Sequence, residues 1–594
     1  MRDNLIEMLI ENTSLYESRD VFRYRKGETS TYSSISWRAL LDNVKKVSKA
    51  LIALGFDTNE NIGIISDNRP EWSMADLGII ASKNVVVPLY STSSKREIKY
   101  ISDETEMKLI FVGNAEQYEK ACWLSENSGT LKYIVTFDNI ADTNNNKCIP
   151  WNKFLELGND NKIETELNAR INAIKPDDLV TIIYTSGTTG DSKGAMLNHK
   201  MFSSAFRIHD RRIDLTEKDV SACFLPLSHV FERTWTFYLL NNGATNVFVG
   251  NPKEVITQLP VVKPTLMCTV PRFFEKTYEG IQLEKAKWSE SKKKIFDWSI
   301  KTGSAYSELK SKSQNASPFL SMKHKIADIL VLRKLRSIFG GRIKYMPCAG
   351  AAISPSLLRF FHAAGIFINY GYGATETTAT VSCFKSDIYN FDTCGSVMPE
   401  LQVKTDNNGE IIIKGDTVFA GYFKKPDVTD TVLRDGWYHS GDKGLITPDG
   451  LLIMTDRIKD LMKTSGGKYV SPQKIETHLG QDPFIEQVIA VGDARKYVTA
   501  LVVPAFETLR HEIKSHDFHM LDNKALIARN EIIEFFHDRI NKLQEEFTPH
   551  ERVVRFVLLP EPFTIQNGYL TNTLKIRRNL LIEQYREEID QMYL

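Results

Sequence analysis

Eleven residues, Tyr184-Thr-Ser-Gly-Thr-Thr-Gly-Asp-Ser-Lys-Gly194, decide how the rest of the chain is interpreted. They follow an apolar run at 179–183 that predicts a buried strand. Backbone N–H groups and hydroxyls in a glycine-rich loop suit the oxygens of a nucleotide triphosphate, and Lys193 adds a positive charge. This is not a Walker A loop, because Lys193 follows Ser192 and not a glycine. The alternative reading is a plain surface turn.

Length and composition bound the class of protein. A chain of 594 residues is long enough for more than one domain, and 42% hydrophobic with 25% charged residues describes an ordinary folded protein. The net charge of +1 gives no pull towards nucleic acid. Seven scattered cysteines without a CxxC pair predict reduced thiols and no zinc site. Without a signal-peptide core or a run of ~20 apolar residues, we expect a cytoplasmic protein, at most peripheral to a membrane.

Strand and helix patterns alternate outward from the opening loop. Apolar residues recur at helical spacing from Trp37 to Leu54, and Gly55 is a natural stop. Strand patterns follow at 62–65 and 85–89, with a helix pattern between them at 71–83. This alternation predicts an α/β fold with a largely parallel sheet. Further strands are expected at 244–249, 266–270, 343–346 and 366–369.

A long polar segment at about 280–338 predicts a helical insertion. Between residues 284 and 336 it holds 13 Lys/Arg against 5 Asp/Glu, a charge of +8. Three consecutive lysines, 292–294, lie beside Trp288, Phe296 and Trp298. Basic residues mixed with aromatic ones suit an anionic membrane surface. The alternative is a solvated helical face.

The pattern changes near Val397. Short strands with turn signals at 410–414, 436–438 and 451–454 predict a small β-barrel or meander. Beyond Arg457-Ile-Lys459 a compact α+β unit is expected. We therefore divide the chain into an N-terminal domain, 1–458, and a C-terminal domain, 459–594, joined by a hinge.

A second motif, Asn369-Tyr-Gly-Tyr-Gly-Ala-Thr-Glu-Thr377, complements the opening loop. Tyr372 offers a flat face for a nucleotide base, and Glu376 a hard oxygen ligand for Mg²⁺. Gly371 and Gly373 allow the backbone to approach a ligand closely. A strand-end turn is the alternative.

The two motifs resemble the phosphate loop and the adenine motif of the adenylate-forming (AMP-binding) synthetases. Two further runs, Leu225-Pro-Leu-Ser-His-Val-Phe-Glu-Arg233 and Val270-Pro-Arg-Phe-Phe-Glu-Lys276, resemble the long-chain fatty acyl-CoA synthetase branch, as does 567–575. The resemblance extends from Trp37 to Lys575. It implies a large domain of layered α/β subdomains with a small β-barrel, and a smaller mobile α+β C-terminal domain.

The resemblance implies a nucleotide site in which Glu376 and Thr185 lie near the metal and Asp442 and Arg457 contact the ribose. Ala349-Gly-Ala-Ala352 departs from the commoner Gly-Gly-Ala-Pro of the family. The residues implied to bind ATP or AMP are Thr185, Ser186, Gly187, Thr188, Thr189, Gly190, Lys193, Gly350, Ala351, Tyr372, Gly373, Ala374, Thr375, Asp442 and Arg457.

Three residues are implied to be catalytic: Lys193, His229 and Lys575. Lys575 would bridge the substrate carboxylate and the α-phosphate, and His229 would lie where the acyl carboxylate meets the nucleotide. The lysine lies in Thr-Leu-Lys-Ile-Arg-Arg578 and not in the commoner Ser-Gly-Lys, which leaves Arg577 and Arg578 as alternatives.

The resemblance also implies a moving C-terminal domain. Lys459 falls at the hinge, and the CoA loop comprises Gly466, Gly467, Lys468 and Tyr469. Residues 460–594 would swing between a pose for adenylation and a pose for thioester formation. Arg233 and Trp235 are the candidates for a gate to the acyl tunnel.

The implied reaction is ATP-dependent activation of a long-chain fatty acid to acyl-AMP with release of pyrophosphate, followed by transfer to CoA. Mg²⁺ would be the cofactor, and ATP and CoA the co-substrates. One alternative is a fatty-acyl-AMP ligase that loads a carrier protein. Another is a non-catalytic fatty-acid-binding protein, which the joint presence of Lys193, Glu376, Asp442, Arg457 and Lys575 argues against.

Overall fold

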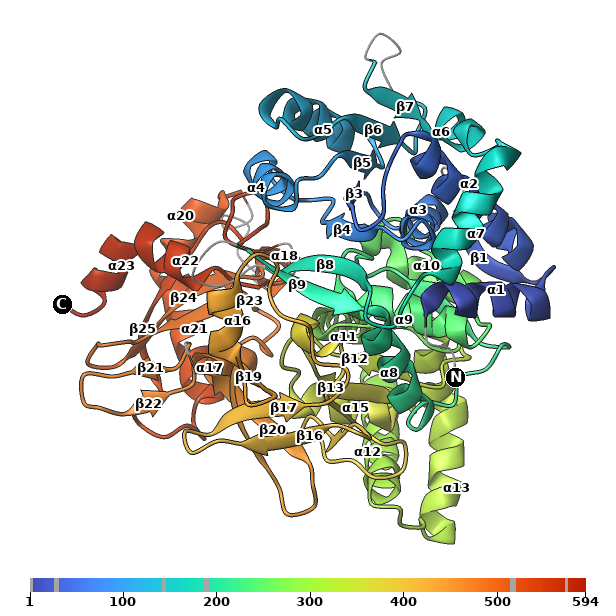
Figure 1. Ribbon diagram of the computed structural model, residues 1–594. Helices are drawn as coiled ribbons and strands as arrows, with labels where there is room; N and C mark the ends of the chain where they lie inside the picture. The colour runs from blue at the N-terminus through green and yellow to red at the C-terminus, as the bar shows by residue number, and fades with distance from the viewer. Residues whose placement is uncertain are drawn as a thin grey trace.

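The structure is a computed structural model, which describes residues 4–25, 31–140, 146–185, 192–458, 460–512, 520–571 and 575–594. The N-terminal part combines three sheets with helices packed on them, and a five-stranded antiparallel sheet follows. The C-terminal part lies at one side of the molecule with a sheet of its own (Figure 1). No helix within these residues is long and apolar enough to cross a membrane.

A seven-stranded sheet forms the centre of the first half of the chain, in the order β7-β6-β5-β3-β4-β8-β9. Every neighbouring pair is parallel except β8 with β9, which confirms the largely parallel sheet expected from the alternating pattern. The strands are β3 (Asn61–Ile65), β4 (Val85–Leu89), β5 (Leu109–Val112), β6 (Tyr133–Thr136), β7 (Cys148–Pro150), β8 (Leu179–Thr185) and β9 (Lys193–Asn198).

Helices α2 (Trp37–Ala53) and α3 (Pro70–Ala81) pack tightly against each other. A Cβ atom on Gly78 would lie 2.4 Å from Val47, so the two backbones approach more closely than a side chain there would allow. Gly55, with φ +81°, follows the C-cap of α2 and stops this helix, as the sequence predicts. The other helices of this half are α1 (Leu5–Tyr16), α4 (Lys95–Thr105), α5 (Ala115–Asn127), α6 (Trp151–Leu157), η1 (Asn161–Ile163), α7 (Glu164–Asn172), α8 (His199–Asp210) and α9 (Val230–Asn241).

Two four-stranded sheets also belong to the large domain, in the orders β10-β11-β1-β2 and β12-β13-β14-β15. The strand expected at 266–270 is reduced to isolated bridges, because Leu266 and Thr269 each pair with single residues of neighbouring segments. The elements are β1 (Asp20–Arg25), β2 (Tyr32–Ser36), β10 (Val220–Cys223), β11 (Thr245–Phe248), β12 (Met346–Cys348), β13 (Ile368–Tyr372), β14 (Ser382–Cys383), β15 (Ser396–Val397), η2 (Pro252–Glu254), α10 (Val255–Val262), α15 (Pro355–Ala363) and η4 (Thr375–Thr377).

The helical insertion is present and projects from the large domain at the lower end of Figure 1. The three aromatic residues beside the lysines differ in exposure: Phe296 of α12 is buried, Trp288 before α12 packs against the core, and Trp298 is 37% exposed. The helices are α11 (Pro271–Ala286), α12 (Glu290–Ser311), α13 (Pro318–Ala327), the π-helical η3 (Asp328–Leu332) and α14 (Arg333–Ile338).

The short strands after Val397 form a five-stranded antiparallel sheet in the order β16-β17-β19-β18, with β20 also paired to β19. Among the described residues no pairing joins β16 to β20, so the sheet is open and not a closed barrel. The elements are β16 (Gln402–Thr405), β17 (Glu410–Lys414), α16 (Pro426–Val432), β18 (Leu433–Arg434), β19 (Trp437–Ile446) and β20 (Leu452–Arg457).

The C-terminal part has two hydrophobic clusters of its own, one on each side of the sheet β23-β24-β25. Its elements are β21 (Met462–Lys463), β22 (Tyr469–Val470), α17 (Pro472–Leu479), β23 (Ile485–Val491), β24 (Val498–Pro504), α18 (Phe506–Glu512), α20 (Asn523–Ile527), α21 (Asn530–Leu543), β25 (Val553–Leu558), α22 (Arg578–Gln584) and α23 (Arg586–Gln591). All seven cysteines of the chain are free thiols, as expected.

Candidate active site

The opening loop connects two strands of an antiparallel hairpin. Thr185 ends β8 and pairs with Lys193, the first residue of β9. The Thr185 hydroxyl donates to the Lys193 carbonyl at 3.4 Å. Both ends of the loop are therefore fixed side by side at the edge of the sheet. The residues between them that the sequence assigns to phosphate binding, Ser186, Gly187, Thr188, Thr189 and Gly190, lie outside the described residues.

The second motif lies at the carboxyl end of β13. A Cβ atom on Gly373 would lie 1.4 Å from the carbonyl oxygen of Ala379, so no other residue fits there without moving the backbone. Gly371 is restricted as well, since a Cβ atom there would lie 2.3 Å from the carbonyl oxygen of Ser382. These glycines bring the following turn, with Ala374 and Thr375, against the strand end next to Tyr372.

Tyr372, Asp442 and Arg457 form one connected group. The Tyr372 hydroxyl donates to Asp442 at 2.5 Å, and the Arg457 guanidinium lies 3.3 Å from the other Asp442 oxygen. Burial and the neighbouring Asp442 carboxylate raise the pKa of Tyr372, so the phenol stays protonated and donates. Register also pairs Asp442 of β19 with Arg457 of β20. The implied base and ribose contacts thus come together from separate parts of the chain.

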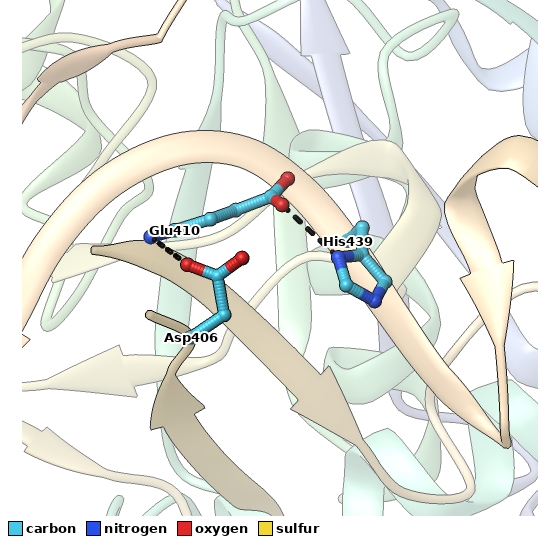
Figure 2. Close-up of side chains that lie close together, drawn as sticks. All are labelled: Asp406, Glu410 and His439. Atoms are coloured by element: carbon cyan, nitrogen blue, oxygen red, sulfur yellow. Dashed lines mark hydrogen bonds and ion pairs between the residues drawn. The ribbon is translucent and has the colours of Figure 1, made fainter. Parts of the chain in front are cut away.

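A carboxylate clamp, Glu410 with Asp406 and His439, holds the bend of β19 just before Asp442 (Figure 2). One Glu410 oxygen accepts the Gly441 N–H at 2.8 Å, and the other lies 3.0 Å from Nδ1 of His439. Asp406 accepts the backbone N–H of Glu410 at 2.8 Å. The three side chains lie close enough to hold a cation, but each already has a hydrogen-bond partner within the chain. The arrangement therefore fixes the strand that carries Asp442.

The small-residue segment after β12 lies at the same edge as the end of β13. These two strands are parallel, so their carboxyl ends meet there. Gly350, with φ +95°, and Ala351 are exposed, and the Tyr370 hydroxyl donates to the Ala351 carbonyl at 3.4 Å. The backbone is thus accessible to a ligand at this edge.

Glu376 and Lys193 meet through Tyr422, a residue that the sequence motifs do not single out. The Tyr422 hydroxyl donates to Glu376 at 2.8 Å, and the Lys193 ammonium lies 5.3 Å from the centre of the Tyr422 ring. The phenol occupies one Glu376 oxygen and leaves the carboxylate next to the Lys193 end of the phosphate hairpin. A carboxylate and a nearby Thr185 hydroxyl fit a hard divalent cation that keeps water and phosphate oxygens as its other ligands.

Lys575 extends from the C-terminal part towards this group. Its backbone N–H donates to the Thr571 hydroxyl at 3.0 Å. The side chain is exposed, yet surrounding protein and the Arg457 charge lower its pKa to about 8, while Asp442 and Glu376 act in the opposite direction. The C-terminal lysine therefore lies within electrostatic reach of the ribose and metal residues.

His229 also lies within electrostatic reach of Lys575. Burial, and then the Lys575 charge, lower the pKa of His229 to about 4, so the imidazole is neutral. Its Nδ1 accepts the Phe231 N–H at 3.2 Å at the start of α9. The ring proton consequently resides on Nε2, which is available to donate to an oxyanion.

The two gate candidates are both buried in α9. Arg233 is 1% exposed and binds both oxygens of Asp76 at 2.9 and 2.5 Å, and it donates to the Thr181 hydroxyl at 2.6 Å. Trp235 donates from its indole N–H to the Ser221 hydroxyl at 3.0 Å. The Arg233 contacts join α9 to α3 and β8, and the gate role of both residues stays a prediction.

Glu232, between His229 and Arg233, was not assigned a role from the sequence. It is fully buried, and neither carboxylate oxygen has a hydrogen-bond partner among the described residues. Burial raises the pKa of Glu232 to about 8, and the Cys223 thiol lies close by. The carboxyl is therefore mostly protonated at neutral pH. Its position next to His229 was the only sequence signal for it.

The CoA loop lies away from this group. Gly466, Gly467 and Lys468 connect β21 to β22, and this hairpin lies at the outer side of the C-terminal part (Figure 1). Gly467 has φ +77°, and Tyr469 is 62% exposed. Lys459, the expected hinge, lies outside the described residues. Of the two regions implied to visit the site, the structure brings Lys575 to it.

Comparison with known families identifies the class of protein to which this chain belongs. The family model of the AMP-binding enzymes matches residues 13–423, and that of the AMP-binding enzyme C-terminal domain matches 459–594. The chain therefore belongs to the AMP-binding, adenylate-forming enzymes. Within them it belongs to the long-chain acyl-CoA synthetase branch, as its curated relatives indicate.

Two of these relatives match over nearly the whole chain. The long-chain-fatty-acid–CoA ligase FadD15 of Mycobacterium bovis is 29% identical over 100% of this chain and 97% of its own length. The human long-chain-fatty-acid–CoA ligase 1 is 31% identical over 95% of this chain and 82% of its own. Both similarities include the N-terminal and the C-terminal parts.

Solved structures share the fold at lower identity. The adenylation domain of a carboxylate reductase from Mycobacterium chelonae is 22% identical with a TM-score of 0.76, covering 99% of this chain and 91% of that one. The anthranilate CoA ligase AuaEII in complex with anthranoyl-AMP is 16% identical with a TM-score of 0.73, covering 99% and 100%. The fold is thus that of adenylate-forming enzymes.

Proposed function

We propose that this chain activates a long-chain fatty acid with ATP and transfers the acyl group to CoA. The observation that carries the proposal is the electrostatic interaction of Lys575 with Arg457, Asp442, Glu376 and His229. The names of the long-chain acyl-CoA relatives support the acyl chain and the thiol acceptor.

In the first step, a carboxylate oxygen attacks the α-phosphorus, an O–P bond forms, and pyrophosphate leaves with the electrons of the broken O–P bond. The protein need only position the two anions and neutralise their charge. Lys575 is the cation for the reacting oxygens, and the neutral His229 donates from Nε2 to the acyl carboxylate. Lys193, together with the phosphate loop that includes Ser186 to Gly190, binds the leaving phosphates.

The nucleoside end of ATP is held within the large domain. Tyr372 provides the face for adenine, with Gly373, Ala374 and Thr375 beside it, and Gly350 and Ala351 close the same edge. Asp442 and Arg457 bind the ribose hydroxyls. Glu376 and Thr185 would hold Mg²⁺, which supplies charge neutralisation at the phosphates when bound.

In the second step, the CoA thiolate attacks the acyl carbon, a C–S bond forms, and AMP leaves with the electrons of the broken C–O bond. We assign domains 1–458 and 459–594 with the hinge at Lys459, a division that the family match to 459–594 supports. Rotation about the hinge withdraws Lys575 and brings the loop of Gly466, Gly467, Lys468 and Tyr469 to the adenylate.

The acyl chain is proposed to run past α9, where Trp235 and Arg233 are the gate candidates. Burial and the Asp76 ion pair make Arg233 the less mobile anchor. Peripheral contact with a membrane on the cytosolic face, through the basic segment 284–336, would suit a substrate that partitions into lipid.

The test is thioester formation with ATP and Mg²⁺ across acetate, octanoate, palmitate and an aryl acid, with pyrophosphate release followed with and without CoA. We expect thioester formation to be greatest with palmitate. Acyl-AMP and pyrophosphate without any thioester would eliminate CoA as the acceptor and favour a carrier protein. If the protein formed neither pyrophosphate nor thioester with any of these acids, the proposal would be overturned.

A further inference from the structure

An apolar face runs along the outside of the helical insertion. Five large hydrophobic side chains of α13 and η3 are exposed, with exposed fractions of 45–64%. The first four recur at spacings of three or four residues, and Leu330 lies four residues after Ile326, so all five share one face of the helix. We name this set the α13 face: Phe319, Met322, Ile326, Ile329 and Leu330.

The α13 face is bordered by positive charge. Lys325, Arg333 and Lys334 are exposed at helix positions next to the apolar residues, and the Lys323 ammonium lies 4.3 Å from the centre of the Phe319 ring. Residues 313–338 contain five Lys/Arg and one acid, Asp328, a charge of +4. Asp328 is paired with Arg336 at 2.6 Å and lies 3.8 Å from Arg333, so it offsets part of the charge of these two arginines and leaves the lysines as the main cations beside the apolar residues.

The opposite face of these helices already has partners. Ala327, Leu332 and Leu335 are buried, and α13 and η3 pack against α12. The exposed apolar residues are therefore not the ones that pack these helices onto the rest of the insertion. At 1.5 Å per residue the stretch from 319 to 333 is about 20 Å long, enough to lie flat on a surface.

We propose that the α13 face docks the protein on an anionic lipid bilayer. The five apolar side chains enter the boundary between headgroups and acyl chains, and Lys325, Arg333 and Lys334 contact anionic headgroups. A bilayer fits better than a second copy of the chain, because a symmetric pair of α13 faces would bring two like charges of +4 together.

The docking proposal deepens the proposed function. It rests on that function only to explain why the protein would bind a bilayer. Long-chain fatty acids reside in bilayers, so a docked enzyme would draw its acyl substrate from the lipid phase. Vesicle binding itself requires no activity and is tested separately.

The experiment is co-sedimentation of the full chain with vesicles of phosphatidylcholine alone and with 30% phosphatidylglycerol. We expect binding to the anionic vesicles and little to the neutral ones. Two triple variants, M322S/I326S/I329S and K325E/R333E/K334E, should each weaken binding at least tenfold. The charge-matched control K132E/K524E/K542E, on exposed lysines of other elements, should bind like the parent.

Circular dichroism and the adenylation rate with octanoate check that each variant is folded and active. Anionic vesicle binding that survives in both α13 variants, or absence of binding by the parent, would overturn the proposal. Sedimentation equilibrium adds a further outcome: self-association of the parent that M322S/I326S/I329S abolishes would assign the face to a second copy instead. If the parent protein itself did not adenylate octanoate, that result would count against the proposed function and not against docking.

Discussion

The two ends of the candidate site are built differently. At the ribose end, Tyr372, Asp442 and Arg457 all belong to the large domain and are joined directly by a hydrogen bond and an ion pair. At the reacting end, Lys575 comes from the C-terminal part and is exposed. One end is preorganised by the fold, and the other depends on where the C-terminal part lies.

This difference matches the two chemical steps. The nucleoside is needed in both, because AMP leaves only in the second step, whereas the lysine is needed only while the O–P bond forms. A fixed ribose end and a removable cation are therefore consistent with one site that serves both reactions.

The largest expected effect follows from removing the cation. Lys575→Ala should lower the rate of acyl-AMP formation by about 10²–10³, because a charge that stabilises the transition state is lost. Thioester formation from added acyl-AMP should be nearly unchanged. Both are measured by pyrophosphate release and thiol consumption. Arg577→Ala is the neighbouring control, and an equal loss in that variant would transfer the role away from Lys575.

A rigid residue at the hinge should impair thioester formation more than adenylation, the reverse of the effect expected for Lys575→Ala. Lys459→Pro should lower thioester formation by about tenfold or more relative to adenylation, since proline fixes φ and restricts rotation between poses. Single-turnover measurements of each half-reaction check this. Lys459→Ala removes the charge without the restriction, and equal loss of both half-reactions in the proline variant would contradict a swinging domain.

The ribose end should respond through ATP binding. Glu410→Ala removes the acceptor of the Gly441 N–H and should raise the KM for ATP about tenfold with a smaller change in kcat, since a hydrogen bond to a charged group is worth about 1.5–3 kcal/mol. Glu410→Gln keeps an acceptor and should restore most of the loss. If both variants raise KM equally, the clamp does not position Asp442.

The smallest effect is a pH dependence at the reacting end. Because the pKa of Lys575 is lowered to about 8, the ammonium is lost as pH rises through this value. The kcat/KM for adenylation should therefore fall above about pH 8, approaching tenfold per pH unit. Lys575→Arg, whose charge persists, should remove this limb of the profile even if its rate is lower. A limb that persists in the arginine variant belongs to another group.

Local patterns predicted the preorganised end better than its connections. The strand before the opening loop, the α2 helix with Gly55 and the β13 motif were predicted because hydrophobic period and glycine position are local properties. The link between Glu376 and Tyr422 spans 46 residues, and the pair of Asp76 with Arg233 spans 157. No single stretch of sequence encodes such pairs.

The reacting end shows where local reasoning stops. Lys575 was named because its surroundings resemble a family motif, and its approach to His229 required the tertiary structure. The insertion gives a similar lesson: its composition indicated a basic helical segment, but the apolar face that the structure leaves exposed is that of α13 and η3, while Phe296 is buried. Which face of a helix is covered depends on its neighbours.

The two glycines at the carboxyl end of β13, Gly371 and Gly373, have a consequence for laboratory evolution. Backbone oxygens occupy the space that a Cβ atom would need at Gly371 and Gly373. A library randomised at these two codons should return almost only glycine after selection for growth, and chemical diversity on the nucleotide side would have to come from other positions. Alternative triphosphates are thus better sought by redesigning Tyr372 itself than by reshaping the strand beneath it.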